Sequence, residues 1–241
     1  MNNYSGLRVV VTGASSGIGL ATAIELTRHG ARVAFVARRG ELLRKLVDEC
    51  GPLAEAYPAD LAREDNIKTL VGKLEKSFEQ LDVLVHSAGM IQTGTLENSG
   101  VDTLDIQYAA NVRAPYVLTR LLLPMLRQAQ GQVIFVNSSI VRAFNIAARG
   151  QFAATQHALR AVADSLRDEV NGDGIRVTSI YPGTTASPRQ ERLHMEARRS
   201  YTPHRMLQPE DVAKSILFAI SMGRNGEVTD LFLRPMQSPV A

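Results

Sequence analysis

Residues 12–19 read Thr12-Gly13-Ala14-Ser15-Ser16-Gly17-Ile18-Gly19, and this stretch decides the fold. Residues 7–12 form a short apolar run that is typical of a buried strand, and residues 18–29 carry apolar side chains at helical spacing. A glycine-rich turn between a strand and a helix lets the backbone approach a pyrophosphate, while the helix N-terminus offers free N–H groups. The stretch therefore predicts a phosphate-binding turn, and a glycine turn without a ligand is the alternative.

Apolar segments and amphipathic segments alternate along the rest of the chain. The expected strands are residues 7–12, 32–37, 54–57, 82–86, 132–137, 175–181 and 227–233, and the expected helices are residues 18–29, 41–49, 64–78, 101–126, 151–171 and 209–222. This alternation predicts a parallel sheet with helices on both faces and right-handed crossovers. The predicted fold class is α/β, a doubly wound parallel seven-stranded sheet in a single domain over residues 1–241.

The composition restricts the class of protein further. The 241 residues, 45% hydrophobic, are enough to bury a sizeable core. A net charge of +3 and an aromatic content of 5% without Trp do not favour nucleic acid as a partner. Cys50 is the single cysteine, which excludes an intrachain disulfide and suits a reducing compartment. We see no leader-like segment, membrane-spanning stretch or metal-ligand spacing, so we expect a cytoplasmic protein without a metal or a membrane partner.

Two arginines at the end of the second expected strand indicate the cofactor. Arg38 and Arg39 stand where an NAD-specific site carries an acid for the ribose hydroxyls, and the first acid here is Glu41. Guanidinium groups suit a 2′-phosphate. The pair therefore predicts NADP(H) rather than NAD(H), and two solvated arginines are the alternative.

Further motifs follow in order, and together they resemble the short-chain dehydrogenase/reductase family in its short, single-domain Rossmann form. They are Thr12-Gly13-x-x-x-Gly17-x-Gly19, Asp60-Leu61, Ala88-Gly89, Asn111, Ser139 and Pro182-Gly183, and they extend over nearly the whole chain. The resemblance implies a small-molecule carbonyl or alcohol substrate. It also implies cofactor contacts from Gly13, Ser15, Ser16, Gly17, Ile18, Gly19, Arg38, Arg39, Asp60, Leu61, Ala88, Gly89, Gln156, Pro182, Gly183 and Thr185.

The resemblance gives individual roles to three polar residues. Asp60 would accept a hydrogen bond from the adenine amino group, with a helix cap as the alternative. Asn111 would hold a water in the proton relay, and its alternative is an asparagine at a helix kink. Ser139 would hydrogen-bond the substrate oxygen, with an ordinary strand-end serine as the alternative.

The resemblance fails at the residues that would transfer a proton. The family carries a Tyr-x-x-x-Lys pair thirteen residues after the catalytic serine, and counting from Ser139 reaches Phe152, with Gln156 at the lysine position. The two residues share one helix face. In the family, the lysine lowers the tyrosine pKa from its free value of about 10. Phe152 has no exchangeable proton and Gln156 has no charge, so we expect strongly impaired proton transfer at these catalytic positions.

Other side chains near the expected site offer no clear substitute acid. Tyr108 lies one turn before Asn111, Tyr181 directly precedes Pro182, and His86 ends the fourth expected strand; a packing or surface role is the favoured interpretation of each. His157 follows Gln156, where a surface position is favoured.

The resemblance also assigns residues 187–206 to a mobile substrate loop. The loop holds Arg189, Arg192, Arg198, Arg199 and Arg205 against Glu191 and Glu196, which is five arginines against two glutamates, a net charge of +3. An anionic substrate group would be attracted there, and a solvated helical loop is the alternative. The resemblance further implies a homodimer or homotetramer, through pairing of the helices expected at residues 101–126 and 151–171.

Three functions remain open on the sequence. The first is an NADP(H)-dependent reductase or dehydrogenase that has lost its proton donor. The second is an enzyme recruited to isomerisation, dehydration or cyclisation in the same pocket. The third is a non-catalytic NADP(H)-binding sensor or partner protein.

Overall fold

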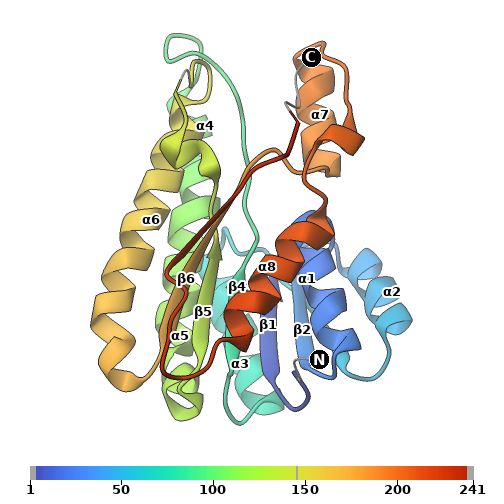
Figure 1. Cartoon of the computed structure of the whole chain (residues 1–241), viewed down its shortest axis with the longest axis vertical. Coiled ribbons are helices and arrows are strands. Elements are labelled where there is room, and N and C mark those ends of the chain that lie inside the picture. The colour runs from blue at the N-terminus through green and yellow to red at the C-terminus, as the bar shows by residue number, and fades with distance from the viewer. Residues whose placement is uncertain (1–3, 145, 238–241) are drawn as a thin grey trace.

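The computed structural model describes residues 4–144 and 146–237, which form one seven-stranded sheet (Figure 1). The strands are β1 (Arg8–Thr12), β2 (Arg32–Ala37), β3 (Ala54–Pro58), β4 (Val83–His86), β5 (Gln132–Val136), β6 (Arg176–Pro182) and β7 (Asp230–Leu233). Their order is β3-β2-β1-β4-β5-β6-β7, and every pairing is parallel. The predicted doubly wound α/β fold is confirmed.

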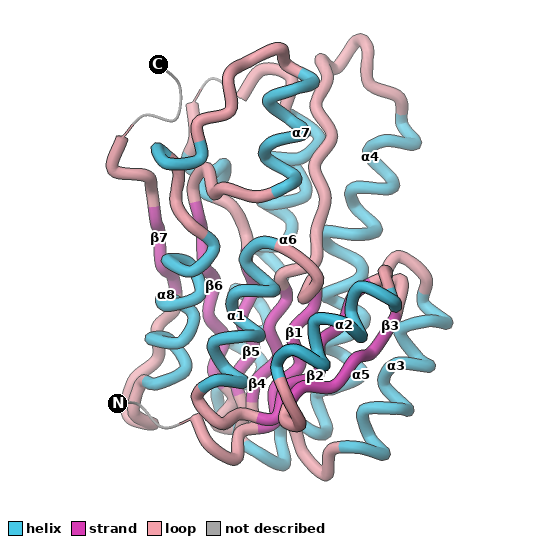
Figure 2. Tube along the Cα trace, turned by 90° about the vertical axis from the view of Figure 1, so that its right-hand side faces the viewer, coloured by secondary structure: helices cyan, strands magenta, loops and turns pink. Residues whose placement is uncertain are grey.

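Helices cover both faces of this sheet (Figure 2). They are α1 (Gly17–Arg28), α2 (Gly40–Cys50), α3 (Glu64–Ser77), α4 (Val101–Tyr108), α5 (Ala114–Ala129), α6 (Gly150–Val170), α7 (Pro188–Glu196) and α8 (Pro209–Ser221). One buried cluster joins α3, α5 and α6 to one face, and a second joins α1, α2 and α8 to the other. None of the helices in the described ranges is long and apolar enough to cross a membrane.

The central strands are buried on both faces, and this burial explains why their sequences are continuous apolar runs. Val10 belongs to the cluster under α3, α5 and α6, whereas its neighbours Val9 and Val11 belong to the cluster under α1, α2 and α8. Successive strand residues point to opposite faces, so both faces need apolar side chains. Leu118 of α5 is fully buried in the first cluster, and truncating such a leucine to alanine costs about 2–5 kcal/mol.

The strand order of the sheet determines where the ligand crevice lies. The strand order reverses between β1 and β4, because β2 and β3 lie on one side of β1 and all later strands lie on the other. In doubly wound sheets, ligands bind beyond the carboxyl ends of the strands at this reversal. The segments that follow β1, β4, β5 and β6 therefore frame the candidate site.

The structure differs from the sequence-based expectation in three elements. The helix expected over 101–126 is interrupted by a π turn at Ala109–Arg113, and the strand expected from residue 227 begins at Asp230. The substrate loop expected over 187–206 contains helix α7 and a short 3₁₀ turn at Pro203–Arg205. Each difference arises from contacts between distant segments, which are described below.

Candidate active site

The glycine-rich turn between β1 and α1 is shaped for close backbone approach. Gly13 has φ +70°, and a Cβ there would lie 2.8 Å from the backbone nitrogen of Ala88. A Cβ on Gly19 would lie 2.6 Å from the carbonyl oxygen of Gly13. The Thr12 hydroxyl accepts hydrogen bonds from the N–H groups of Ser87 at 3.0 Å and Ala88 at 3.1 Å. The turn and the segment after β4 therefore form one rigid edge of the crevice.

Two helix N-termini begin beside each other at this edge. Ser16 is the N-cap of α1, but no side chain caps the helix and no acid lies in its first turn. Ser187 is the N-cap of α7, and its Cβ lies 3.6 Å from the Cβ position of Gly17. Uncapped N–H groups and the positive end of a helix dipole favour an anion. This place fits a pyrophosphate.

The segment after β6 holds three further predicted residues near the same edge. Pro182 ends β6, and the Gly183 N–H donates to the Leu233 carbonyl of β7 at 2.8 Å. The Thr185 hydroxyl donates to the Gly183 carbonyl at 3.0 Å. These bonds fix the direction in which the chain leaves the sheet toward α7.

The residues expected to bind the adenine end of the cofactor come together at the carboxyl end of β2. Arg39 donates to the Ser15 hydroxyl at 3.2 Å across the glycine turn. The exposed Arg38 and the half-buried Asp60 together line a pocket of about 300 Å³. One Asp60 oxygen accepts from the Ala62 N–H at 3.2 Å, which orients the carboxylate. The N-cap of α3 is Arg63. Asp60 therefore stabilises the turn before α3 and does not cap the helix, which was the alternative role expected for it.

The two apolar residues of the predicted set have packing roles. Leu61 is half-buried against the cluster under α3 and α5, and Ile18 packs on the cluster under α1. Both therefore hold the backbone of their motifs in place.

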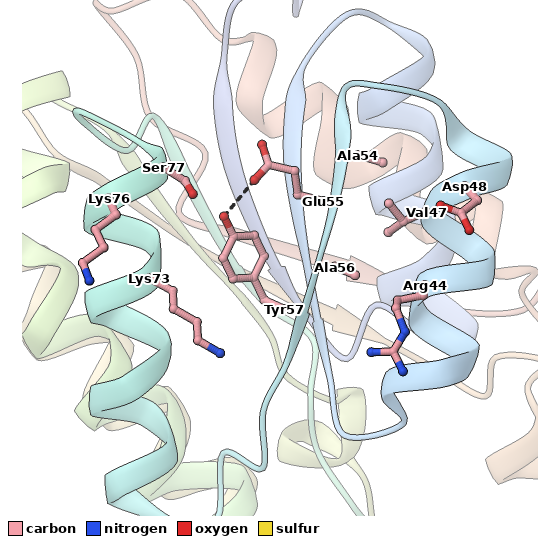
Figure 3. Close-up of a pocket in the computed structure, with 10 residues that line it drawn as sticks. All are labelled: Arg44, Val47, Asp48, Ala54, Glu55, Ala56, Tyr57, Lys73, Lys76 and Ser77. Carbon is pink, nitrogen blue, oxygen red and sulfur yellow. Dashed lines mark hydrogen bonds between the residues drawn. The ribbon is translucent and has the colours of Figure 1, made fainter.

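A larger pocket, of about 680 Å³, lies outside this crevice (Figure 3). It follows the outer edge of β3 between α2 and α3, and Arg44, Lys73 and Lys76 are among its lining residues. Tyr57, which donates to Glu55 at 2.8 Å, lies at its centre. The pocket belongs to the sheet edge and contains none of the residues predicted for the site.

Asn111 connects the π turn to the predicted catalytic helix. Its buried side chain accepts from the Met90 N–H at 2.8 Å and donates to the Met90 carbonyl at 2.9 Å. The same amide donates to the Thr155 hydroxyl at 3.0 Å, and that hydroxyl donates to the Phe152 carbonyl at 2.8 Å. The kink in the helix therefore brings Asn111 to α6, as the interpretation of Asn111 as a helix-kink residue expects, and its role in a proton relay stays a prediction.

Gln156 and Ser139 complete this wall of the site. Asn137 donates to the Gln156 backbone carbonyl at 3.1 Å and accepts from the Ser138 N–H at 2.7 Å. Ser139 is half-buried and begins a short 3₁₀ turn that packs against α6. Within the described ranges, neither the Ser139 hydroxyl nor the buried Gln156 amide has a hydrogen-bond partner, so both are available to a ligand.

The candidate substitute acids are packing residues. His86 is buried, contacts the Thr119 hydroxyl at 2.7 Å and stacks on Phe135, and burial lowers its pKa to about 3. Tyr181 is buried and stacks on Phe232 at 4.2 Å, and burial raises its pKa to about 12. Neither group titrates near neutral pH, which agrees with a structural role for both.

The two remaining candidates lie on the surface. Tyr108 is 49% exposed on α4, and His157 is exposed on α6. Across residues 4–144 and 146–237, no group of three or more His, Cys, Asp and Glu side chains is arranged to hold a metal ion.

Sequence reasoning missed three residues that build this site, Asn137, Thr155 and Ser187. Asn137 and Thr155 make buried hydrogen bonds that no local pattern indicates. Ser187 was recognisable, because a serine followed directly by proline is typical of a helix start. It was instead assigned to the substrate loop that the family resemblance implies.

The fold and the crevice define a doubly wound α/β protein with a phosphate-binding turn at its strand reversal. Residues 8–197 match the family model described as short chain dehydrogenase. The chain therefore belongs to the short-chain dehydrogenase/reductase family, as its motifs indicated.

Relatives and solved structures agree with this membership. An uncharacterized oxidoreductase of Staphylococcus saprophyticus is 28% identical over 233 residues, covering 94% of this chain and 96% of the relative. A short chain dehydrogenase from Burkholderia cenocepacia in complex with NADP matches with a TM-score of 0.86 and 29% identity, covering 96% and 98% of the two chains. L-Sorbose reductase from Gluconobacter frateurii, complexed with NADPH and L-sorbose, matches with a TM-score of 0.85 and 26% identity over 97% of each chain.

Proposed function

We propose that this chain binds NADP(H) in the crevice but is strongly impaired in ordinary carbonyl reduction and alcohol oxidation. The residues present fit the cofactor. The uncapped start of α1 would hold the pyrophosphate, Arg38 and Arg39 the 2′-phosphate, and Asp60 the adenine. When bound, NADPH supplies a hydride. Several similar solved structures carry NADP or NADPH, which supports the same choice here.

The proposed impairment rests on the identity of two residues, Phe152 and Gln156, in a wall of the site whose other residues are in place. Asn111, Thr155 and Ser139 are in place around α6, yet Phe152 offers no proton and Gln156 no charge. A positioned general acid contributes about 10²–10⁴ in rate, or roughly 3–5 kcal/mol of transition-state stabilisation. Binding of the cofactor depends on backbone groups and arginines elsewhere, so it is retained.

Recruitment to isomerisation, dehydration or cyclisation is the weaker alternative. Such chemistry requires an acid or base in the pocket, and the pKa values of His86 and Tyr181 lie at about 3 and about 12. A non-catalytic NADP(H)-binding sensor is the stronger alternative, because it needs the cofactor crevice and no proton donor. A partner whose affinity depends on NADPH would favour the sensor.

A double reversion tests the proposal. The natural chain and Phe152→Tyr/Gln156→Lys are each titrated with NADPH, whose own fluorescence reports binding, and then given a panel of aldehydes and ketones. We expect similar NADPH affinities and a gain of about 10² or more in NADPH oxidation for the reverted chain. Absence of NADPH binding would overturn the proposal. Binding without any gain would favour the sensor.

The proposals for the oligomeric state and the cellular location of the protein also draw on its resemblance to the family. Ile106, Tyr108 and Tyr116 on α4 and α5 are each about half exposed, at 52%, 49% and 54%. These exposed large side chains lie on the elements that the resemblance places at the interface, so we propose a homodimer or homotetramer through α5 and α6, measurable by light scattering. The lone Cys50 is consistent with a cytoplasmic location, which we also propose.

A further inference from the structure

Two arginine side chains of helix α7 hydrogen-bond to the segment that follows β4. Arg189 donates to the Gly89 carbonyl at 2.5 Å, and Arg192 donates to the Ile91 carbonyl at 3.4 Å. Figure 2 shows α7 beside the segment that leads from β4 to α4. At its start, α7 also adjoins Gly17 through Ser187. The helix therefore connects the phosphate-binding turn to the segment after β4.

Arg189 differs from the other arginines of this loop in charge balance and in position. Arg192 pairs with Glu196 at 3.3 Å, and Arg198 is exposed without a side-chain contact to the described residues. Arg189 reaches the crevice and has no carboxylate partner in the same ranges of the chain. Desolvation, and then the charge of Arg192, lower its pKa, although the residue as a whole is exposed. A guanidinium stays charged in proteins, so this positive charge is uncompensated.

The guanidinium of Arg189 lies close to the wall that carries Phe152. A Cβ on Gly89, whose carbonyl Arg189 binds, would lie 3.1 Å from the side-chain oxygen of Asn111. Asn111 is bonded to Thr155, and Thr155 to the Phe152 carbonyl. Arg189 therefore contacts the segment after β4 at Gly89, next to the bonds that join Asn111 to α6, whereas Arg38 and Asp60 line the pocket expected at the adenine end.

We propose that Arg189 is a specificity-determining residue that pairs with a carboxylate group of the small-molecule ligand of this site. The inference rests on the proposed function, because it names the substrate class of the same crevice. A guanidinium carries five N–H donors in a planar fork, and Arg189 donates one of them to the Gly89 carbonyl. The fork matches a carboxylate with two parallel bonds, and such charge-assisted bonds are about twice as strong as neutral ones. A carboxylate would also compensate the positive charge of Arg189.

Matched acids and esters test this inference. The probes are pyruvate, acetoacetate and levulinate, each with its methyl ester, which removes the charge and keeps the carbonyl. Binding to the natural chain is measured by calorimetry, with and without NADP⁺, at one ionic strength. The reverted chain Phe152→Tyr/Gln156→Lys supplies kcat/KM for the same pairs. Arg189→Gln is the test variant, and Arg198→Gln removes an equal charge from the same loop without a contact in the crevice.

We expect at least one acid to bind about ten-fold more tightly than its ester, the size of a charge-assisted contact. Arg189→Gln should abolish this preference and leave the ester unchanged, whereas Arg198→Gln should retain the preference. Equal binding of acid and ester in all three pairs overturns the inference, as does a preference that survives Arg189→Gln. An equal loss for acid and ester would show a structural role and also overturn it.

The same measurements separate this inference from the proposed function. A chain that fails to bind NADP⁺ contradicts the proposed function, yet a preference for acids in the unloaded chain still supports Arg189. If the chain binds NADP⁺ and binds acids and esters with equal affinity, the result supports the cofactor site and contradicts the role of Arg189.

Discussion

The side-chain amide of Asn111 donates to the Thr155 hydroxyl at 3.0 Å and so joins the π turn to α6. This bond lies between the segment after β4 and the helix that carries Phe152 and Gln156. It does not depend on a tyrosine or a lysine, because Asn111 uses Met90 and Thr155 as partners. The wall of the site is therefore formed by residues other than the two that depart from the family, and restoring them should require little rearrangement.

The first prediction concerns the pH dependence of single and double reversions. In alcohol oxidation, the tyrosine must lose its proton to act as a base. Phe152→Tyr alone places a tyrosine beside the uncharged Gln156, so its activity should rise with pH toward the free pKa of about 10. Adding Gln156→Lys supplies a cation, which favours the charged tyrosinate and lowers its pKa by about 1–3 units. We expect the midpoint of the kcat/KM profile with NADP⁺ to move down by that amount.

The control for this experiment is Gln156→Lys alone, which should stay as inactive as the natural chain, because it still lacks a hydroxyl at position 152. Identical midpoints for the single and double reversions would mean that residue 156 does not act on residue 152 in this site.

The second prediction concerns cofactor choice. Arg38→Ala and Arg39→Ala each remove a guanidinium from the predicted 2′-phosphate site, beside Asp60 and Ser15 respectively. A hydrogen bond to a charged group contributes about 1.5–3 kcal/mol, so each change should weaken NADPH binding by about ten-fold or more. NADH has no 2′-phosphate, and its affinity should change little. Arg44→Ala on α2 is the charge-matched control, and a similar loss in that variant would contradict the assignment.

Elements that are decided by local pattern were predictable from the sequence. Glycine turns and short apolar runs predicted the strands near their observed ends, as at residues 132–137 against β5 (Gln132–Val136). The spacing from Ser139 likewise located Phe152 and Gln156, which the structure places on the wall with Asn111 and Ser139.

Elements that depend on distant contacts were not predictable. The π turn around Asn111 follows from its bonds to Met90, 21 residues earlier, and helical periodicity carries no signal of this. The last strand starts late because Glu227 accepts from the Val177 N–H through its side chain, and the Val228 carbonyl accepts from the Thr178 hydroxyl. These side-chain contacts replace backbone pairing at Glu227 and Val228, and backbone pairing begins where the Ser179 N–H donates to the Thr229 carbonyl at 2.8 Å. Likewise, net charge alone could not separate Arg189 from the other arginines of its loop.

The third prediction compares two glycines. Gly13→Ala would place a Cβ 2.8 Å from the backbone of Ala88, at φ +70°, so it should lower the free energy of unfolding by about 1–3 kcal/mol. Gly72 lies inside α3, and its Cβ position meets nothing within 4 Å. Gly72→Ala should instead raise the free energy of unfolding by about 0.5–1 kcal/mol. Urea unfolding followed by circular dichroism measures both, and equal effects would contradict the close approach at Gly13.

The last prediction concerns His86 and the acid side of the stability curve. Burial lowers the pKa of His86 to about 3, while the unfolded chain takes up a proton near the ordinary value of about 6.5. Between these two values the unfolded state binds one more proton than the native state, so the free energy of unfolding falls as the pH drops below about 6.5, by about 1.4 kcal/mol per pH unit. From pH 7 to pH 5, His86 should account for a loss of about 2 kcal/mol.

His86→Gln keeps a side chain able to bond the Thr119 hydroxyl and removes the titration. Its free energy of unfolding should therefore fall by about 2 kcal/mol less than that of the natural chain between pH 7 and pH 5. His157→Gln changes an exposed histidine and should preserve the natural pH dependence. If His86→Gln instead follows the natural chain at both pH values, His86 takes up its proton in the folded protein as readily as in the unfolded chain, and a titratable group then lies behind the candidate site at the end of β4.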